Sequence, residues 1–199
     1  MTPELDIALA SRHPKIYPPY FTDGRFGFEC MDGWADLLDA AAGLVQQHVD
    51  ATGADQVFAR QVKEKFGSLR IYLWNADDRP LAIFDLIEGL SASICEECGR
   101  PGTIKDRNGW LRCRCPEHLT SEVVQISRPI PSEQAAATLR ELLDAALRLF
   151  NYNVQPCLRW FAQPATALES IPPTSILHSH KGRKQILNLL RQIEFGVSS

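Results

Sequence analysis

Two short pairs of metal-ligating residues lie near the middle of the chain. Cys95 and Cys98 are separated by two residues, and Cys115 and His118 repeat that spacing further along. Zinc prefers four thiolate or imidazole ligands in a tetrahedron, and a tight turn can present two ligands from positions three apart. Because four such ligands fill the coordination sphere, the spacing predicts a closed, structural Cys3His zinc site and not a catalytic one.

Three neighbouring residues leave alternatives open at this cluster. Cys113 is separated from Cys115 by one residue, which is poor geometry for two ligands of one metal, so we expect a small buried side chain. Whether Cys113 contributes to the metal site stays open. A second open alternative is that the whole cluster consists of buried thiols that bind no metal. Glu96 and Glu97, inside the first pair, are interpreted as solvated turn residues and not as general bases.

The rest of the sequence offers little chemistry for an enzyme. It contains no GxxxxGK[ST], GxGxxG or GxSxG string, and no H-x-E precedes the first cysteine pair. The run Lys63–Lys65 is interpreted as a polar turn between strands. Cys30 and Cys157 have no visible partner and are expected to be buried as small hydrophobic residues. We therefore expect no catalytic residues and a protein that is not an enzyme.

Composition and charge place the chain among ordinary globular proteins. Its 199 residues are 45% hydrophobic and 23% charged, with a net charge of -3. Residues 1–128 carry 14 basic against 19 acidic side chains and residues 129–199 carry 7 against 5, so neither part is basic enough to make nucleic acid the obvious partner. The sequence shows no secretory signal and no long apolar run, so we expect a cytoplasmic protein with no membrane contact. In that compartment the six cysteines are expected to be thiols or metal ligands and not disulfides.

The elements that must position the first cysteine pair alternate between helix and strand. Apolar residues at helical spacing predict a helix over 33–49, with Asp32 as its possible N-cap and Gly53 at its end. Residues 56–74 predict a β-hairpin, and a further amphipathic helix leads directly into Cys95. The first 30 residues, rich in proline, glycine and aromatic residues, are interpreted as an irregular arm. This pattern predicts an α+β domain over 1–128 that contains a zinc ribbon over 95–118.

Only helices are expected after a boundary near residues 128–131. Ser132 is placed as a cap before a long amphipathic stripe, and a second helical piece ends before Pro164. The last helix opens near residues 181–183 and stops at Gly196, a natural residue to follow a helix end. The segment 129–199 is therefore predicted to be a separate, all-α domain.

The C-terminal segment resembles the toxin-binding domain of the MbcA/ParS/Xre antitoxins. The resemblance starts near residue 145 and keeps the family's order: a helix ending in phenylalanine, a Trp-containing piece before a proline, and a glycine-led helix that ends in I-E-x-G. The positions that carry it are Leu147-Arg148-Leu149-Phe150-Asn151, Leu158-Arg159-Trp160-Phe161, Pro164, Ala167-Leu168, Ile171-Pro172-Pro173, Ile176-Leu177, Gly182-Arg183, Ile186, Leu189-Leu190, Ile193-Glu194 and Gly196-Val197.

The resemblance implies a helical module that binds and inhibits a protein toxin. The implied toxin is of the RES type, an enzyme that degrades NAD, and the last helix and tail would obstruct its active-site cleft. The family also tends to self-associate, which implies a possible homo-oligomer. Carried over to this sequence, the implied partner contacts are Gly182, Arg183, Arg191, Glu194, Phe195, Gly196 and Val197.

The upstream region departs from that family. Its antitoxins usually carry a helix-turn-helix DNA-binding segment, whereas this chain has a hairpin and a probable ribbon resembling an uncharacterised domain of bacterial and phage proteins. The departure puts repression at an operator in doubt. An alternative function is a zinc-ribbon regulator that contacts nucleic acid through basic residues near the metal, namely Arg100, Lys105, Arg107, Arg112 and Arg114.

Overall fold

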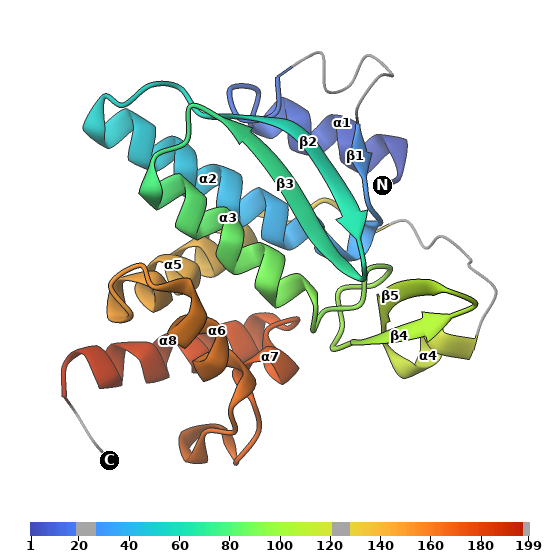
Figure 1. Cartoon of the computed structure of the whole chain (residues 1–199). Helices are drawn as coiled ribbons and strands as arrows, with labels where there is room; N and C mark the ends of the chain where they lie inside the picture. Colours follow the sequence, from blue (N-terminus) through green and yellow to red (C-terminus); the bar gives the residue numbers. More distant parts are fainter. Residues whose placement is uncertain (19–26, 121–127, 197–199) are drawn as a thin grey trace.

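A computed structural model describes residues 1–18, 27–120 and 128–196 (Figure 1). The interpretation of the first 30 residues as an irregular arm was wrong for Pro3–Arg12, which form helix α1, and its part over 19–26 lies outside the described residues. Pro3 lies at the first helical positions, where no backbone N–H is needed, and Leu5 and Leu9 bury one side of the helix. Tyr17 follows, and its hydroxyl donates to the carbonyl of Leu38 at 2.9 Å, which fixes this segment on the core.

Helix α2 (Ala35–Thr52) forms the centre of the molecule, preceded by the short turn η2 (Asp32–Trp34). It ends as predicted at Gly53, whose φ of 69° favours glycine. Asp32 does not cap this helix. Its buried carboxylate instead accepts hydrogen bonds from the amide and hydroxyl of Thr2, at 2.7 and 2.9 Å, and so ties down the N-terminus.

The predicted hairpin is confirmed and belongs to a three-stranded sheet. Strand β2 (Phe58–Lys65) pairs antiparallel with β3 (Ser68–Trp74), and the short β1 (Phe28–Glu29) lies parallel to β2 on its other side. Lys63–Lys65 belong to β2, so their interpretation as a turn was wrong. The turn consists of Phe66 and Gly67, both with positive φ, which suits the twist of a tight hairpin.

Helix α3 (Asp78–Ser91) supports the hairpin and protects its open edge. The Ser91 hydroxyl accepts the amide of Leu69 at 2.8 Å, and the Glu88 carboxylate accepts that of Ile71 at 2.5 Å. These bonds satisfy backbone donors that an edge strand would otherwise expose. The helix then delivers the chain to Cys95, as expected. A second hairpin, β4 (Thr103–Arg107) and β5 (Trp110–Arg114), leads into the short helix α4 (Pro116–Thr120).

The C-terminal part is helical, as predicted. Ser132 caps α5 (Glu133–Leu149) by accepting the amide of Ala135 at 3.3 Å. The elements that follow are α6 (Val154–Ala162), η3 (Thr166–Leu168), α7 (Pro173–Ile176) and α8 (His180–Glu194). Every helix in the described ranges is too short or too polar to cross a lipid bilayer.

The fold class predicted from the sequence is confirmed, with α+β structure followed by helices. Figure 1 shows the sheet on one side of α2 and α3, with α5 and α8 on the other. Buried side chains of both parts join in one cluster that runs from Leu5 to Leu190. The division into domains 1–128 and 129–199 stays a prediction, because these parts share that core.

Candidate metal centre

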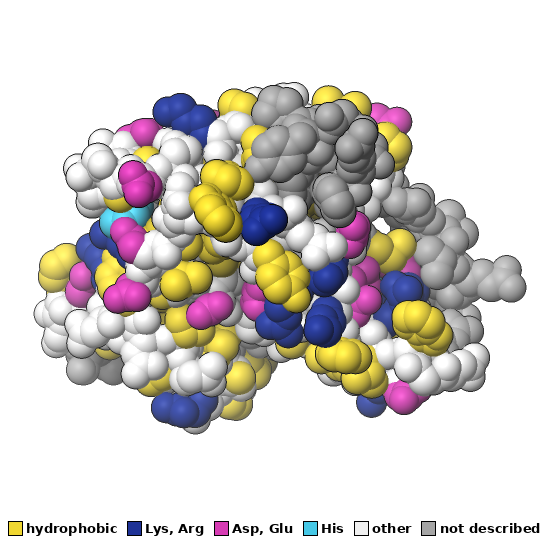
Figure 2. Space-filling model, turned by 45° about the horizontal axis from the view of Figure 1, so that its top comes forward, with side chains coloured by type: hydrophobic (Ala, Val, Ile, Leu, Met, Phe, Trp, Pro, Cys, Tyr) yellow, Lys and Arg dark blue, Asp and Glu magenta, His cyan; other side chains and the backbone are white. Residues whose placement is uncertain are grey.

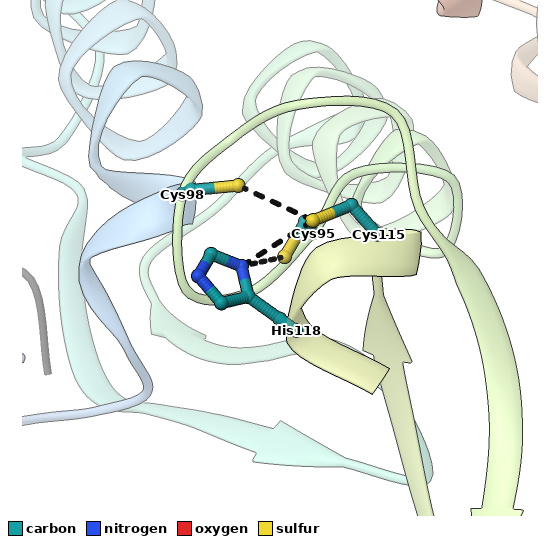
Figure 3. A group of neighbouring side chains, drawn as sticks. All are labelled: Cys95, Cys98, Cys115 and His118. Atoms are coloured by element: carbon teal, nitrogen blue, oxygen red, sulfur yellow. Dashed lines mark hydrogen bonds between the residues drawn. The ribbon is translucent and has the colours of Figure 1, made fainter. Parts of the chain in front are cut away.

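The four predicted ligands converge on one point (Figure 3). Cys95 and Cys98 come from the loop after α3, whereas Cys115 and His118 come from the end of β5 and from α4. Their ligand atoms all lie within 4.8 Å of one another. The Nδ1 atom of His118 is 3.4 Å from the sulfur of Cys95 and 3.3 Å from that of Cys115. This cluster could therefore hold a metal ion.

The spacing of the sulfurs fits a tetrahedral ion better than a disulfide. The Sγ atoms of Cys98 and Cys115 are 3.7 Å apart, and all six cysteines are free. A disulfide requires roughly 2.0 Å between sulfurs. Two thiolates each about 2.3 Å from one zinc ion in a tetrahedron lie about 3.8 Å apart. The donor set and its dimensions therefore suit a closed four-ligand site.

Backbone turns hold the first pair in place. The amide of Gly99 donates to the carbonyl of Cys95 at 2.9 Å, and the amide of Cys95 donates to the carbonyl of Arg100 at 2.7 Å. Gly99 has a φ of 75°, a conformation that side chains with Cβ rarely adopt. Gly102 packs so closely that an added Cβ would lie 2.8 Å from the Cys95 amide nitrogen. Both glycines are thus needed for the geometry of the ligand loop.

The protonation of the thiols is set by burial and by one arginine. Burial raises the pKa of Cys95 to about 12, although hydrogen bonds from the backbone of Cys115, Cys98 and Glu97 lower it in part. Burial also acts to raise the pKa of Cys98, but hydrogen bonds from the side chain and backbone of Arg100 and from the thiols of Cys95 and Cys115 together outweigh it, so that the pKa of Cys98 falls below its usual value. Because a metal binds thiolates, its binding would release protons from the buried thiols.

Glu96 and Glu97 are not solvated, and that interpretation was wrong. They are only 1% and 4% exposed. Glu97 pairs with Arg114 and lies 3.7 Å from the Nε2 atom of His118, the ring nitrogen that faces away from the sulfurs. A carboxylate at that nitrogen helps to orient a histidine ligand. Burial raises the pKa of Glu96 to about 7, while Arg112, 3.5 Å away, favours its charged form.

The basic residues of the ribbon are largely occupied by these carboxylates. Arg114 is buried against Glu97, Arg112 pairs with Glu96, and Arg100 forms an ion pair with Glu117. Lys105 is exposed, and the side chain of Arg107 lies outside what the structure describes. Three of the five residues in the alternative nucleic-acid interface are therefore already paired with acids.

Cys113 lies beside the cluster but outside the group of four. It is fully buried, and its thiol donates to the carbonyl of Ala92 at 3.2 Å. Burial raises its pKa to about 12. Cys30 and Cys157 are buried as well, which confirms their interpretation as small hydrophobic residues. The other candidate group of the sequence lies on α8.

Two of the implied partner contacts on α8 are buried within this chain. A Cβ added to Gly182 would lie 2.0 Å from the carbonyl oxygen of Ile176, so this glycine permits close packing. The guanidinium of Arg183 donates to the carbonyl of Leu177 at 2.8 Å and pairs with Asp36 of α2. Gly182 and Arg183 thus hold α8 in place, and both are buried within this chain.

Four of the remaining implied contacts, Arg191, Glu194, Phe195 and Gly196, lie at the exposed end of α8. Arg191 pairs with Glu141 of α5, and Glu194 lies 3.7 Å from Arg148 of the same helix. Phe195 is 75% exposed just after the helix, and Gly196 ends it with a φ of 68°. Val197 lies outside the described residues. This end therefore presents an aromatic side chain between helix α8 and the C-terminus.

Comparison with known proteins gives one relative with an assigned role. The chain is 26% identical over 120 residues to a curated protein of Photorhabdus laumondii named Antitoxin Xre, covering 60% of this chain and 75% of that protein. The aligned length exceeds that of segment 129–199, so the similarity extends into the preceding region. No protein-family model matches the chain, and no solved structure matches it.

Proposed function

We propose that this chain is an antitoxin that binds and blocks a protein toxin. The similarity to Antitoxin Xre over 120 residues carries the proposal. The residue order from 145 onward, which resembles the toxin-binding domain of MbcA/ParS/Xre antitoxins, supports the finer assignment of a RES-type, NAD-degrading toxin. The function is thus binding, and the chain itself performs no catalysis.

The toxin-binding end is assigned to Phe195 and the last turn of α8. Phe195 is 75% exposed and Ile193 is 45% exposed, although most apolar side chains of the helix are buried. Arg191 and Glu194 flank them with charge. An exposed aromatic anchor surrounded by polar groups is typical of the residues that dominate protein interfaces. Segment 129–199 would act as the toxin-binding unit, and Asp36 on α2 holds its last helix in place.

Within this proposal the metal is zinc and its role is structural. Three thiolates and one imidazole are typical ligands of structural zinc sites, and they leave no open position for water or substrate. The buried carboxylate of Glu97 would orient His118. The ion would hold the 95–118 ribbon together beside the toxin-binding part and take no part in a reaction.

Phe195→Ala is expected to abolish neutralisation of a RES-type toxin. Loss of an interface anchor costs roughly 2–4 kcal/mol, or about 30-fold or more in affinity. Bacteria that express such a toxin from the source genome should keep their NAD and grow when the intact chain is co-expressed. With the variant they should lose both, and titration of purified toxin should give the matching drop in affinity.

Phe66→Ala is the matched control, because Phe66 is a similarly exposed phenylalanine in the β2–β3 turn. It should neutralise the toxin as well as the unchanged chain does. A truncation after Glu194 removes Phe195 together with the residues that follow it, and it should reproduce the effect of Phe195→Ala. Full neutralisation by both C-terminal variants would contradict the assignment of the binding end, and no neutralisation by the intact chain would contradict the function.

A further inference from the structure

The outer face of the β2–β3 hairpin carries aromatic side chains that the core does not use. The inner face is formed by residues such as Val62 and Leu69, which are fully buried against the helices. On the outer face and its turn, Trp74 is 50% exposed, Tyr72 44% and Phe66 67%. Three large rings in contact with solvent on one hairpin are unusual unless the surface binds something.

Each of these rings lies beside a cation from strand β2. The guanidinium carbon of Arg60 is 5.3 Å from the ring centre of Trp74, and the Lys63 ammonium is 5.1 Å from that of Tyr72. At the turn, the Lys65 ammonium lies 5.5 Å from the ring centre of Phe66. We call these three pairs the basic–aromatic band, defined by Arg60, Lys63, Lys65, Phe66, Tyr72 and Trp74.

The cations of the band are not neutralised by acids, although the Lys63 ammonium donates a hydrogen bond to the Gln61 side chain at 2.9 Å. Within the described ranges no carboxylate forms an ion pair with Arg60, Lys63 or Lys65. The ribbon arginines differ in this respect, because they are paired with acids. Figure 2 shows hydrophobic and basic side chains alternating across this face of the molecule.

The band continues onto the ribbon at the hairpin turn. A Cβ added to Gly67 would lie 3.0 Å from the side chain of Ile104 in β4, so the turn and the ribbon touch. Ile104 and Trp110 are themselves exposed. The exposed surface of the turn therefore adjoins the ribbon at Ile104. The net charge of the chain is -3, so the local positive charge of the band runs against the overall charge.

We propose that the basic–aromatic band binds single-stranded DNA. Proteins that bind single strands without sequence preference combine a basic track for the phosphates with rings on which successive bases stack. Tyr72 and Trp74 lie two residues apart on one face of β3, which places their rings about 7 Å apart for neighbouring bases. The outer face offers cations and planar rings. The carboxylate of Glu29 on β1 accepts a hydrogen bond from the side-chain amide of Gln61 at 3.0 Å.

This site is independent of the proposed toxin-binding function. Helix α8 packs on α5 and strand β3 packs on α3, so that α8 and β3 lie on different sides of the helical core (Figure 1). The same purified chain can therefore be tested for both activities. A variant that removes one activity is the control for the other.

Trp74→Ala in the full chain is expected to weaken binding of a fluorescent oligo(dT) of about 12 nucleotides by roughly 5- to 100-fold. Binding is measured by anisotropy at about 50 mM salt, where phosphate contacts are strong. Tyr72→Leu, which keeps an apolar side chain but removes the aromatic plane, should weaken it similarly. Lys63→Ala should weaken binding and reduce its salt dependence by about 0.7 per lost phosphate contact. Phe195→Ala should bind as the unchanged chain does.

Several outcomes would overturn the proposal. The intact chain could show no affinity for oligo(dT) at low salt, both ring variants could keep the full affinity, or oligo(U) could bind more tightly than oligo(dT). Heparin carries charge but no bases, so equal losses of heparin and oligo(dT) binding in Trp74→Ala would exclude stacking. A homodimer that Trp74→Ala dissociates would show that the band is an interface between copies of the chain.

Discussion

Cys98→Ser is expected to abolish stoichiometric zinc binding and to unfold the 95–118 ribbon. Serine cannot supply a thiolate, and three remaining ligands leave the tetrahedron incomplete. The ribbon has few buried apolar residues of its own, since Ile104, Trp110 and Leu111 are exposed, so the metal must supply much of its stability. Structural zinc contributes apparent binding free energies of about 10–16 kcal/mol in small zinc-binding peptides.

Metal analysis of the purified chain should give about one zinc per chain, and close to none for Cys98→Ser. Amide exchange should accelerate across 95–118 and stay slow in α5 and α8, whose core lies elsewhere. Cys113→Ser is the matched control. Its hydroxyl can keep the bond to the carbonyl of Ala92, and it should retain the metal. Metal loss from Cys113→Ser, or unchanged exchange of 95–118 after chelation, would contradict the ligand set.

The metal ligands could be found from the sequence because their spacing is local. Each pair is fixed by one tight turn, so that Cys95 and Cys98 indicate half of the site without any knowledge of the fold. The residues around the ligands depend on pairing across the ribbon. Glu96 and Glu97 are buried because Arg112 and Arg114 of β5 lie against them. In the sequence, two acids between cysteines indicated exposure to solvent instead.

The helices and the hairpin could be predicted for the same reason, since hydrophobic periodicity is a local property. Helices α2 and α5 and the hairpin follow their patterns closely. Helix α1 was missed because the many prolines and glycines near it dominate the composition, although proline is tolerated at a helix start. Phe66 and Gly67 set the position of the turn in the β2–β3 hairpin, and the charged run before them does not.

The packing role of Arg183 could not be predicted from the sequence, because its ion-pair partner is far away in the chain. Asp36 and Arg183 are 147 residues apart, and no local pattern links them. In the structure Arg183 is buried, with Asp36 and the carbonyl of Leu177 as acceptors. Arg128 approaches the same carboxylate at 3.8 Å. Asp36 therefore joins α2 to α8 and to the segment before α5, and it makes the position of α8 depend on the N-terminal part.

Arg183→Met is expected to lower the free energy of unfolding by about 3 kcal/mol, the usual cost of removing one partner of a buried ion pair. Methionine fills much of the space but leaves the Leu177 carbonyl without this donor and Asp36 without its closest cation. Urea unfolding of the metal-loaded chain measures the change. Lys184→Met is the matched control, because Lys184 is exposed on the next position of α8 and its loss should change stability by about 0.5 kcal/mol or less.

A second substitution separates the ion pair from packing. In Arg183→Met combined with Asp36→Asn, an uncharged amide replaces the carboxylate that Arg183→Met would leave without its cation, so the double variant should lose less stability than the sum of the single variants. Strict additivity would mean that Arg183 acts through its packing and its bond to Leu177 alone. Arg183→Met should weaken toxin neutralisation only to the extent that it loosens the packing of α8. Phe195→Ala, in contrast, should remove neutralisation without lowering the free energy of unfolding. Equal stability of Arg183→Met and Lys184→Met would contradict the role of this pair in holding the helix.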